Sequence, residues 1–168
     1  INGMGTANIV EAAAAQSNPP KLIHVSSLAA REPRLSPYAA SKHLGEQMVR
    51  ARQENLPVAI LRPPAVYGPG DMETLRIFQM AARGFVPAPM VAGARTSLAH
   101  VGDVVGAIFA VLALDEPPGA PIEFDDGHPH GYTWPEIAAA AGLALSLLAI
   151  WFIARSITWP LGVLSKAA

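Results

Sequence analysis

Leu22-Ile-His-Val25 and Val58-Ala-Ile-Leu61 are short apolar runs rich in branched side chains, and they decide the fold of this 168-residue chain. Such runs are typical of strands that are buried on both faces of a parallel sheet. Between them, residues 37–54 have the pattern of a helix, with Pro37 in the first turn, where its missing N–H costs no hydrogen bond. A strand, a helix and a second strand in this order predict a parallel sheet of α/β type.

Further elements extend this unit in both directions. The pattern predicts a helix over residues 4–17, a helix from a cap at Asp71 to about Arg83, extended segments over 85–98, an apolar helix capped by Asp103 and ending near Leu114, a short strand over 121–124, and a last helix that begins at a capping box of Thr133 and Glu136. We therefore expect an α/β domain over residues 1–142, with a partial doubly wound sheet and a small mixed C-terminal region. An apolar tail over residues 143–168 follows it.

The composition excludes several classes of function. The net charge is -1 at pH 7, so the chain lacks the basic surface that nucleic-acid binding needs. It has no cysteine, which excludes disulfides, thiolate metal sites and cysteine nucleophiles, and we predict no metal. Hydrophobic residues make up 51% of the chain and charged residues 15%, so the chain can bury a core.

Tyr38-Ala-Ala-Ser-Lys42 has the clearest chemical meaning. A spacing of four places both side chains on one face of the predicted helix. An ammonium near a phenol favours the phenolate, which makes the tyrosine usable as a general acid or base. The alternative is a surface tyrosine and lysine that share a helix face without any chemical role.

Two loops that directly follow the predicted strands add to this candidate site. Ser26 and Ser27 end the first strand, and ligands of parallel sheets bind beyond the carboxyl ends of the strands. Arg62-Pro-Pro-Ala-Val-Tyr-Gly-Pro-Gly70 follows the second strand. Alternatively, the serines only hydrogen-bond backbone groups in the turn, and the second loop is a rigid turn of Pro and Gly. We interpret His100-Val-Gly-Asp103 as a helix cap with a hydrogen-bonded histidine.

Taken in order, and together with Asn2-Gly-Met-Gly-Thr6, these segments resemble the extended short-chain dehydrogenase/reductase family, also called the NAD-dependent epimerase/dehydratase family. The resemblance covers about residues 1–142 and implies a Rossmann-like sheet. It implies that Tyr38 exchanges a proton with the reacting oxygen, that Lys42 assists Tyr38 and binds the nicotinamide ribose, and that Ser27 orients the substrate oxygen. The residues that it places against the cofactor are Ser26, Tyr38, Lys42, Pro64, Ala65 and Val66.

The resemblance also implies a nicotinamide cofactor, NAD or NADP, and a small substrate with a hydroxyl or carbonyl group. The glycine-rich turn that holds the cofactor phosphates should lie before residue 1, so we expect a truncated chain that is inactive alone. The loop from Ser27 to Tyr38 is shorter than in the family's nucleotide-sugar epimerases, which favours a hydrophobic ketone, a steroid-like alcohol, or an isoprenoid or lipid. By analogy with the family, we expect a homodimer that forms through the helix carrying Tyr38.

The tail departs from the family's pattern. From Ile137 to Ala154 there is no charged residue, and this length reaches the lower limit for crossing a bilayer. The tail from about Leu143 resembles the end of a transmembrane helix that enters the linker domain of bacterial sensor kinases and chemoreceptors, and the segment from Ala154 to Leu161 carries this likeness. Three interpretations stay open: a buried or amphipathic helix, membrane contact through residues 137–161, or an artefactual join from gene prediction.

Three classes of function follow from these patterns. The leading one is an NAD(P)-dependent oxidoreductase or epimerase/dehydratase that acts through Tyr38, Lys42 and Ser27. The second is a non-catalytic binding or assembly subunit that keeps the fold, and the third is a membrane-tethered signalling fragment, which only the tail suggests. We expect a cytoplasmic protein, associated with the membrane if the tail is an anchor.

Overall fold

The computed structural model describes residues 2–72, 75–76, 79–80, 83 and 93–140. The chain divides into two compact units. The first unit contains residues 1–69 and 96–131, and the second contains residues 70–95 and 132–168. The predicted boundary at residue 142 lies outside the described residues and stays a prediction.

The first unit is built around a parallel sheet of three strands in the order β1-β2-β6. These strands are β1 (Leu22–Val25), β2 (Val58–Arg62) and β6 (Ile122–Glu123). All three run in the same direction, with β1 paired to β2 and β2 paired to β6. The predicted parallel α/β sheet is therefore confirmed, and β6 is the short strand expected over residues 121–124.

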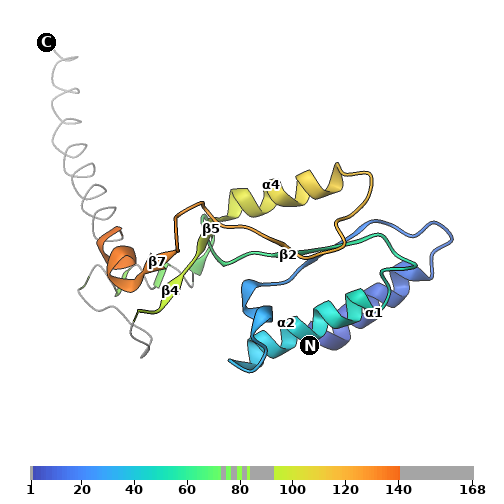
Figure 1. The fold of residues 1–168 in the computed structure, drawn as a ribbon, viewed down its shortest axis with the longest axis horizontal. Helices are drawn as coiled ribbons and strands as arrows, with labels where there is room; N and C mark the ends of the chain where they lie inside the picture. Colours follow the sequence, from blue (N-terminus) through green and yellow to red (C-terminus); the bar gives the residue numbers. More distant parts are fainter. Residues whose placement is uncertain (1, 73–74, 77–78, 81–82, 84–92, 141–168) are drawn as a thin grey trace, which may run out of the picture. The chain divides into compact units, whose positions relative to one another are not determined.

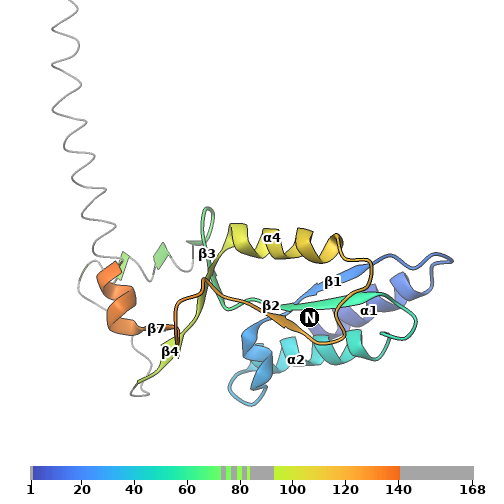
Figure 2. The ribbon, with the colours of Figure 1, turned by 45° about the horizontal axis from the view of Figure 1, so that its top comes forward.

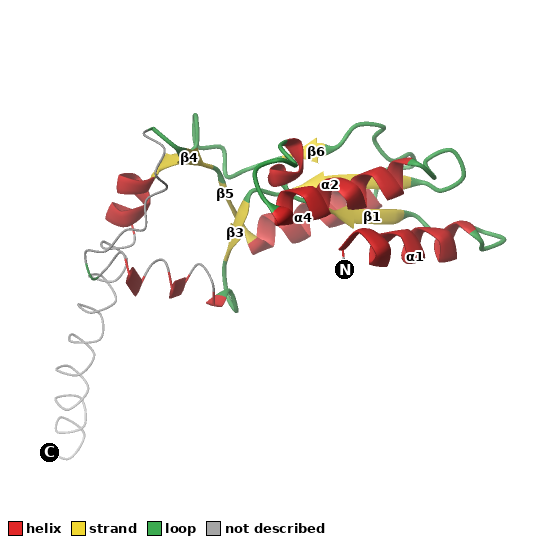
Figure 3. Ribbon diagram, turned by 90° about the horizontal axis from the view of Figure 1, so that it is seen from below, coloured by secondary structure: helices red, strands yellow, loops and turns green. Residues whose placement is uncertain are grey.

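Helices cover both faces of this sheet. Helices α1 (Asn2–Ala14) and α2 (Pro37–Arg50) lie on one side, and α4 (Val101–Leu112) lies on the other (Figures 1 and 2). Figure 3 shows the helices, the strands and the connecting loops in different colours. A parallel sheet needs such helices because each crossover returns the chain to the same end of the sheet.

Strand β2 contributes to the core on both faces, because successive side chains of a strand point to opposite sides of the sheet. The cluster on the side of α1 and α2 contains Val10, Val49, Leu56, Val58 and Ile60. The cluster on the side of α4 contains Ala59, Leu61 and Val111. The apolar run that predicted a strand buried on both faces is thus confirmed for β2.

Strand β1 is less buried than the sequence predicted. Leu22, Ile23 and His24 are only half-buried, and Val25 is 39% exposed. Among the described residues, β1 lies at the edge of the sheet with β2 as its one neighbour. An edge strand is covered by fewer neighbours than a central strand, which explains the difference.

Helix ends also differ from the prediction. The first helix covers Asn2–Ala14 rather than 4–17, and α2 ends at Arg50 rather than at 54. After α2 the chain continues in turns, in which Arg52 N donates to Val49 O at 3.1 Å. Hydrogen bonds of this shorter type are common where a helix ends, and a pattern of apolar residues does not reveal them.

The cap of α4 was assigned to the wrong residue. The side chain of His100, rather than that of Asp103, caps this helix, since His100 Nδ1 accepts a hydrogen bond from Gly102 N at 3.1 Å. Asp103 lies in the first turn, where a carboxylate favours the positive end of the helix dipole.

The described part of the chain contains two further pairs of strands. Strand β3 (Ala65–Tyr67) pairs in parallel with β5 (Leu98–His100), and β4 (Arg95–Thr96) pairs with β7 (Tyr132–Thr133). The expected capping box is confirmed, because Thr133 N donates to Glu136 Oε2 at 2.7 Å at the start of helical residues 134–140.

Several predicted segments fall on residues outside the described part of the chain. Of the helix predicted after Asp71, residues 72, 75–76 and 79–80 are described and are helical. The extended segments over 85–98 are described only at 93–98, and the tail over 143–168 lies outside the described residues. Within the described residues, we find no helix with the length and apolar character that crossing a membrane requires.

Candidate functional site

The turn after β1 lies beside the loop after β2. Ser26 and Ser27 directly follow β1 and lead into a 3-10 helix, η1 (Leu28–Arg31), which the sequence did not predict. The backbone N–H of Leu28 donates to Pro63 O at 3.0 Å. The structure therefore brings together the two loops that the sequence placed at the carboxyl ends of neighbouring strands.

Helix α2 begins with two features that hold its first turn. Ser36 Oγ accepts a hydrogen bond from Ala39 N at 3.0 Å, and Pro37 occupies the first helical position. Tyr38 therefore lies in the first turn, and its side chain is 53% exposed. A ligand can reach the phenol from solvent.

Lys42 links the face of α2 to the end of β1. Lys42 Nζ donates to the backbone O of Val25 at 3.2 Å, and it lies 5.9 Å from the centroid of the Tyr38 ring. Tyr38 and Lys42 therefore share one face of the helix, as their spacing indicated. An ammonium has three N–H donors, so the bond to Val25 leaves donors for a ligand.

Ser27 caps the 3-10 helix that follows it. Its Oγ accepts a hydrogen bond from Ala29 N at 3.2 Å. Ser27 therefore does bind a backbone group in the turn, which is the alternative role that the sequence left open. It does not exclude contact with a ligand, because an accepting hydroxyl can still donate its hydrogen.

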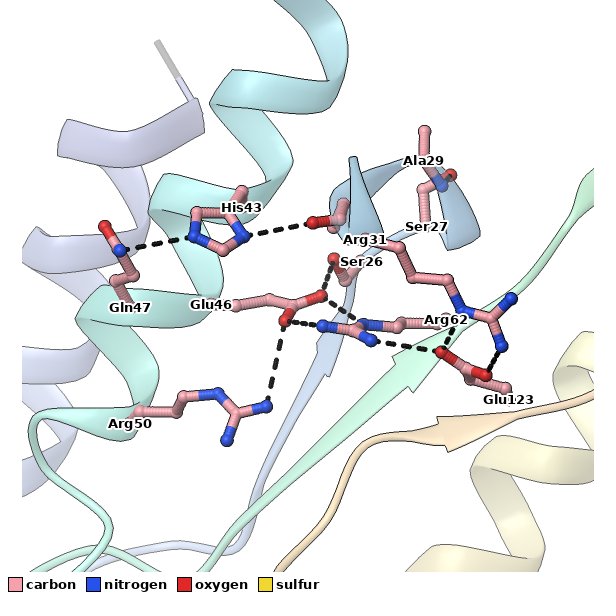
Figure 4. A network of polar contacts seen from close by, with 11 residues as sticks. Ser26, Ser27, Ala29, Arg31, His43, Glu46, Gln47, Arg50, Arg62 and Glu123 are labelled. Carbon is pink, nitrogen blue, oxygen red and sulfur yellow. Dashed lines mark hydrogen bonds and ion pairs between the residues drawn. The ribbon is translucent and has the colours of Figure 1, made fainter. Parts of the chain in front are cut away.

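A buried carboxylate, Glu46, lies one helical turn beyond Lys42 and is 2% exposed. Its Oε1 accepts from Ser26 Oγ at 2.6 Å and from Arg62 Nε at 2.8 Å, and its Oε2 accepts from Arg62 Nη2 at 2.6 Å. Figure 4 shows Glu46 reaching from α2 toward Ser26 and toward the paired nitrogens of Arg62. This bidentate pairing fixes the guanidinium in its plane.

Arg62 extends the network to the third strand of the sheet. Arg62 Nη1 donates to Glu123 Oε1 at 3.0 Å, and Arg31 Nε donates to the same oxygen at 2.7 Å. Glu123 belongs to β6 and Arg31 to η1 (Figure 4). One connected group of charges thus joins the ends of all three strands to α2 and to the serine turn.

The charges of this network stabilise one another. Burial alone would raise the pKa of Glu46, but hydrogen bonds from Arg62 and Ser26 outweigh it, and the pKa lies below its usual value. The hydrogen bond to Glu46 is the largest cause of the raised pKa of Arg62. The hydrogen bond from Arg31 is the largest cause of the lowered pKa of Glu123. All four groups are therefore ionised at neutral pH.

The sequence reasoning missed Glu46, Glu123 and Arg31, and it treated Arg62 only as the start of a loop. One signal was present: Glu46 continues the series of four-residue steps from Tyr38 and Lys42, in a chain with only 15% charged residues. The partner of Glu46 gave no such signal. Arg62 lies 16 residues further along the chain, beyond the reach of helical periodicity.

His24, on β1, lies beside this network. Its Nε2 is buried and has no hydrogen-bond partner among the described residues. Gly45 approaches it so closely that a Cβ there would lie 3.2 Å from this nitrogen. Burial is the largest cause of the lowered pKa of His24, and Lys42 adds to it, while Glu46 acts in the opposite direction. His24 is therefore mainly neutral at pH 7.

The remaining predicted cofactor contacts have different surroundings. Pro64 and Val66 are half-buried and Ala65 is exposed, just after β2. Ser26 is 3% exposed, and its hydroxyl hydrogen is used in the bond to Glu46. A cofactor contact by Ser26 would therefore use its hydroxyl oxygen or its backbone. These assignments stay predictions.

In the part of the chain that the structure describes, no group of three His, Cys, Asp or Glu side chains is arranged to hold a metal ion. The side chains of the site are suited to proton transfer. They are the exposed phenol of Tyr38, the nearby ammonium of Lys42 and the hydroxyl of Ser27 in the turn after β1.

Comparison with known proteins adds a family to this geometry. The model of the NAD dependent epimerase/dehydratase family matches residues 1–123. Ceramide reductase from Caulobacter vibrioides is 45% identical over 146 residues, which cover 84% of this chain and 43% of that protein. The chain thus spans less than half the length of this relative.

Solved structures share the fold. UDP-glucose 4-epimerase from Thermus thermophilus, in complex with NAD, is 25% identical with a TM-score of 0.66, over 86% of this chain and 54% of that chain. UDP-glucuronic acid 4-epimerase from Bacillus cereus, in complex with NAD, is 21% identical with a TM-score of 0.70, over 86% of this chain and 53% of that chain. The predicted Rossmann-like α/β fold class is confirmed.

Proposed function

Because the chain belongs to the NAD-dependent epimerase/dehydratase family, we propose that it supplies the proton-transfer site of an NAD(P)-dependent oxidoreductase. One observation carries the proposal: Lys42 is anchored to Val25 O at 3.2 Å and stands 5.9 Å from the ring of the exposed Tyr38. The chain covers 43% of its reductase relative, so the proposed activity is that of the whole protein.

Each of the three residues has a distinct role in this proposal. Tyr38 donates its phenol proton to the substrate oxygen during reduction and accepts it during oxidation. Lys42 places a positive charge near the phenol and so favours the phenolate that remains. Ser27 donates its hydroxyl hydrogen to the same substrate oxygen and orients it. The pairing serves a reductase, an epimerase or a dehydratase equally well.

The described residues fit a nicotinamide cofactor. Lys42 has N–H donors beyond the one it uses on Val25, and a ribose offers hydroxyl acceptors for them. Pro64, Ala65 and Val66 offer apolar surface for the nicotinamide ring. When bound, the nicotinamide supplies or accepts the hydride, while the protein provides orientation and the proton. We favour NAD, with NADP as the alternative, because the matched family is NAD dependent and the two solved structures are complexes with NAD. We propose the cytosol as the compartment.

We propose that the substrate is a ketone or secondary alcohol on a lipid. The ceramide reductase relative, at 45% identity, supports a lipid over a nucleotide sugar. The short loop from Ser27 to Tyr38 supports it as well, because less chain is available to contact a sugar. A small substrate region in the C-terminal part of the chain belongs to the same proposal. A homodimer and membrane contact through residues 137–161 stay predictions.

The test is Tyr38→Phe in the full-length protein, assayed with NADH on a long-chain keto-lipid and, in parallel, with NAD on UDP-glucose. We expect kcat to fall by about 10²–10⁴-fold, because general acid–base catalysis contributes about that much. Binding of NADH, followed by its fluorescence, should be unchanged, since the ring and Lys42 remain.

Undiminished turnover by Tyr38→Phe would contradict the proposal. If the wild-type protein binds NADH but turns over no ketone or alcohol, the non-catalytic binding subunit becomes the better description. Turnover of UDP-glucose alone would keep the site and refute the lipid.

A further inference from the structure

We propose that Glu46 is a positioning residue of this site: its buried carboxylate holds the serine turn and Arg62 against the face of α2 that carries Tyr38 and Lys42. The inference rests on the proposed function and deepens it. It assigns a role to a group that does not itself touch the reacting atoms.

Two cross-links run from α2 to the same short turn. Lys42 Nζ binds the backbone O of Val25, and Glu46 Oε1 binds the hydroxyl of Ser26 at 2.6 Å. Ser27 is the next residue along the chain. With the two residues before it tied to successive turns of one helix, the position of Ser27 relative to the phenol-bearing face is restricted in both distance and rotation.

The second arm of Glu46 extends this restraint to β2. Both of its oxygens accept from Arg62, which in turn donates to Glu123 on β6. Arg62 directly precedes Pro63 and Pro64, the start of the loop that we assign to the nicotinamide. One carboxylate therefore fixes both loops to the helix that carries the proton donor (Figure 4).

Burial explains why this contact is stiff. Glu46 is 2% exposed and Ser26 is 3% exposed, so water does not compete for either group. A carboxylate without partners is costly to bury, and here its oxygens receive three hydrogen bonds from Ser26 and Arg62. Charge-assisted hydrogen bonds in such surroundings are short and directional, whereas an apolar contact of equal volume would not define an orientation.

The experiment compares four variants of the full-length protein in the assay described above. Ser26→Ala removes one arm, Glu46→Gln keeps an oxygen for Ser26 but loses the charge, and Glu46→Leu removes both arms. Glu11→Gln is the matched control, since Glu11 pairs with Arg52 at a similar 2.7 Å but is 59% exposed on α1.

We expect kcat per NADH-binding site to fall by about 10-fold for Ser26→Ala and about 100-fold for Glu46→Leu, because a displacement of about 1 Å costs that much. Glu46→Gln should recover part of the loss, and Glu11→Gln should match the wild type. The dissociation constant of NADH should stay unchanged in Glu11→Gln, and kcat of the other three is measured at saturating NADH, so that a change in cofactor affinity does not enter it. A purely structural defect would instead lower the number of binding sites and leave the turnover of each site intact.

The double variant Ser26→Ala/Glu46→Leu adds an internal check. Its loss of kcat should be close to that of Glu46→Leu alone, because both changes break the same contact. Glu46→Leu carries the greatest risk of misfolding, so Ser26→Ala and Glu46→Gln decide the question if it fails to fold.

Full kcat per site in both Ser26→Ala and Glu46→Gln, with Tyr38→Phe inactive, would overturn the positioning role and leave the proposed function standing. Full kcat in Tyr38→Phe would remove the proposed function, and this inference with it.

Discussion

Two glutamate–arginine pairs of the first unit have the same chemistry and different surroundings. Glu46 Oε2 lies 2.6 Å from Arg62 Nη2, and the side chains are 2% and 15% exposed. Glu11 Oε1 lies 2.7 Å from Arg52 Nη2, and the side chains are 59% and 43% exposed. Distance therefore does not distinguish the pairs, whereas burial does.

The difference shows what a buried charge does in this fold. Water and salt compete with the pair of Glu11 and Arg52, so holding its two long side chains together stabilises the fold little. In the network of Glu46, the buried carboxylate and Arg62 are largely shielded from water and depend on each other, so the loss of Glu46 leaves Arg62 with only its bond to Glu123. The network also lies where β1, β2 and β6 end, which is where the fold places its candidate site.

The largest expected effect is that of Glu46→Ala on stability. We expect the free energy of unfolding to fall by about 3 kcal/mol, at the lower end for a broken buried pair, because Glu123 still binds Arg62. Urea unfolding of the full-length protein, with and without Glu46→Ala, measures it. A loss as small as that of Glu11→Ala would show that burial does not distinguish the pairs.

The intermediate effect is a dependence of stability on pH that His24 causes. The charges of Lys42 and Glu46 act on this histidine. In the folded state its pKa lies below 6.5, so the unfolded chain binds more protons between these two values. Its contribution to stability is therefore complete above pH 6.5 and is lost as the pH falls toward the lowered pKa. Urea midpoints between pH 7.5 and 5 should decline less steeply for His24→Gln than for the wild type. Equal slopes would refute the assignment.

The smallest effect is expected on the exposed pair. Glu11→Gln should change the free energy of unfolding by about 0.5 kcal/mol or less, because exposed ion pairs contribute little. Added salt should make the difference in free energy of unfolding between the wild type and Glu11→Gln still smaller, because salt screens exposed charges. A change as large as that of Glu46→Ala would contradict the role given to burial.

Most of the local structure could be predicted from the sequence. The apolar runs gave β1 and β2, and the position of Pro37 gave the start of α2, because these features depend on residues close together in the chain. The shared face of Tyr38 and Lys42 followed from helical periodicity alone. The boundaries were less accurate, since helix ends depend on individual turn hydrogen bonds, such as Arg52 N to Val49 O.

The surroundings of these elements could not be predicted in the same way. We predicted Asp103 as the cap of α4 because aspartate is a preferred capping residue. In the fold, His100 Nδ1 instead accepts the hydrogen bond from Gly102 N in the first turn. The partial burial of β1 depends on the order of strands in the sheet. The residues of a strand do not by themselves determine whether the strand lies at the edge or in the centre of its sheet.

What the sequence by itself determined is the succession of α1, β1, α2, β2, α4 and β6, and the placement of a phenol and an ammonium on one helical face, whereas β3 was taken for a loop and η1 was missed. Periodicity and capping decide these, and both act over a few residues. Only the tertiary structure decided that Glu46 is buried against Ser26 and Arg62, and that Arg62 also binds Glu123. Those contacts join four segments of the chain, and their strength comes from the exclusion of water, which exists only after the segments have packed.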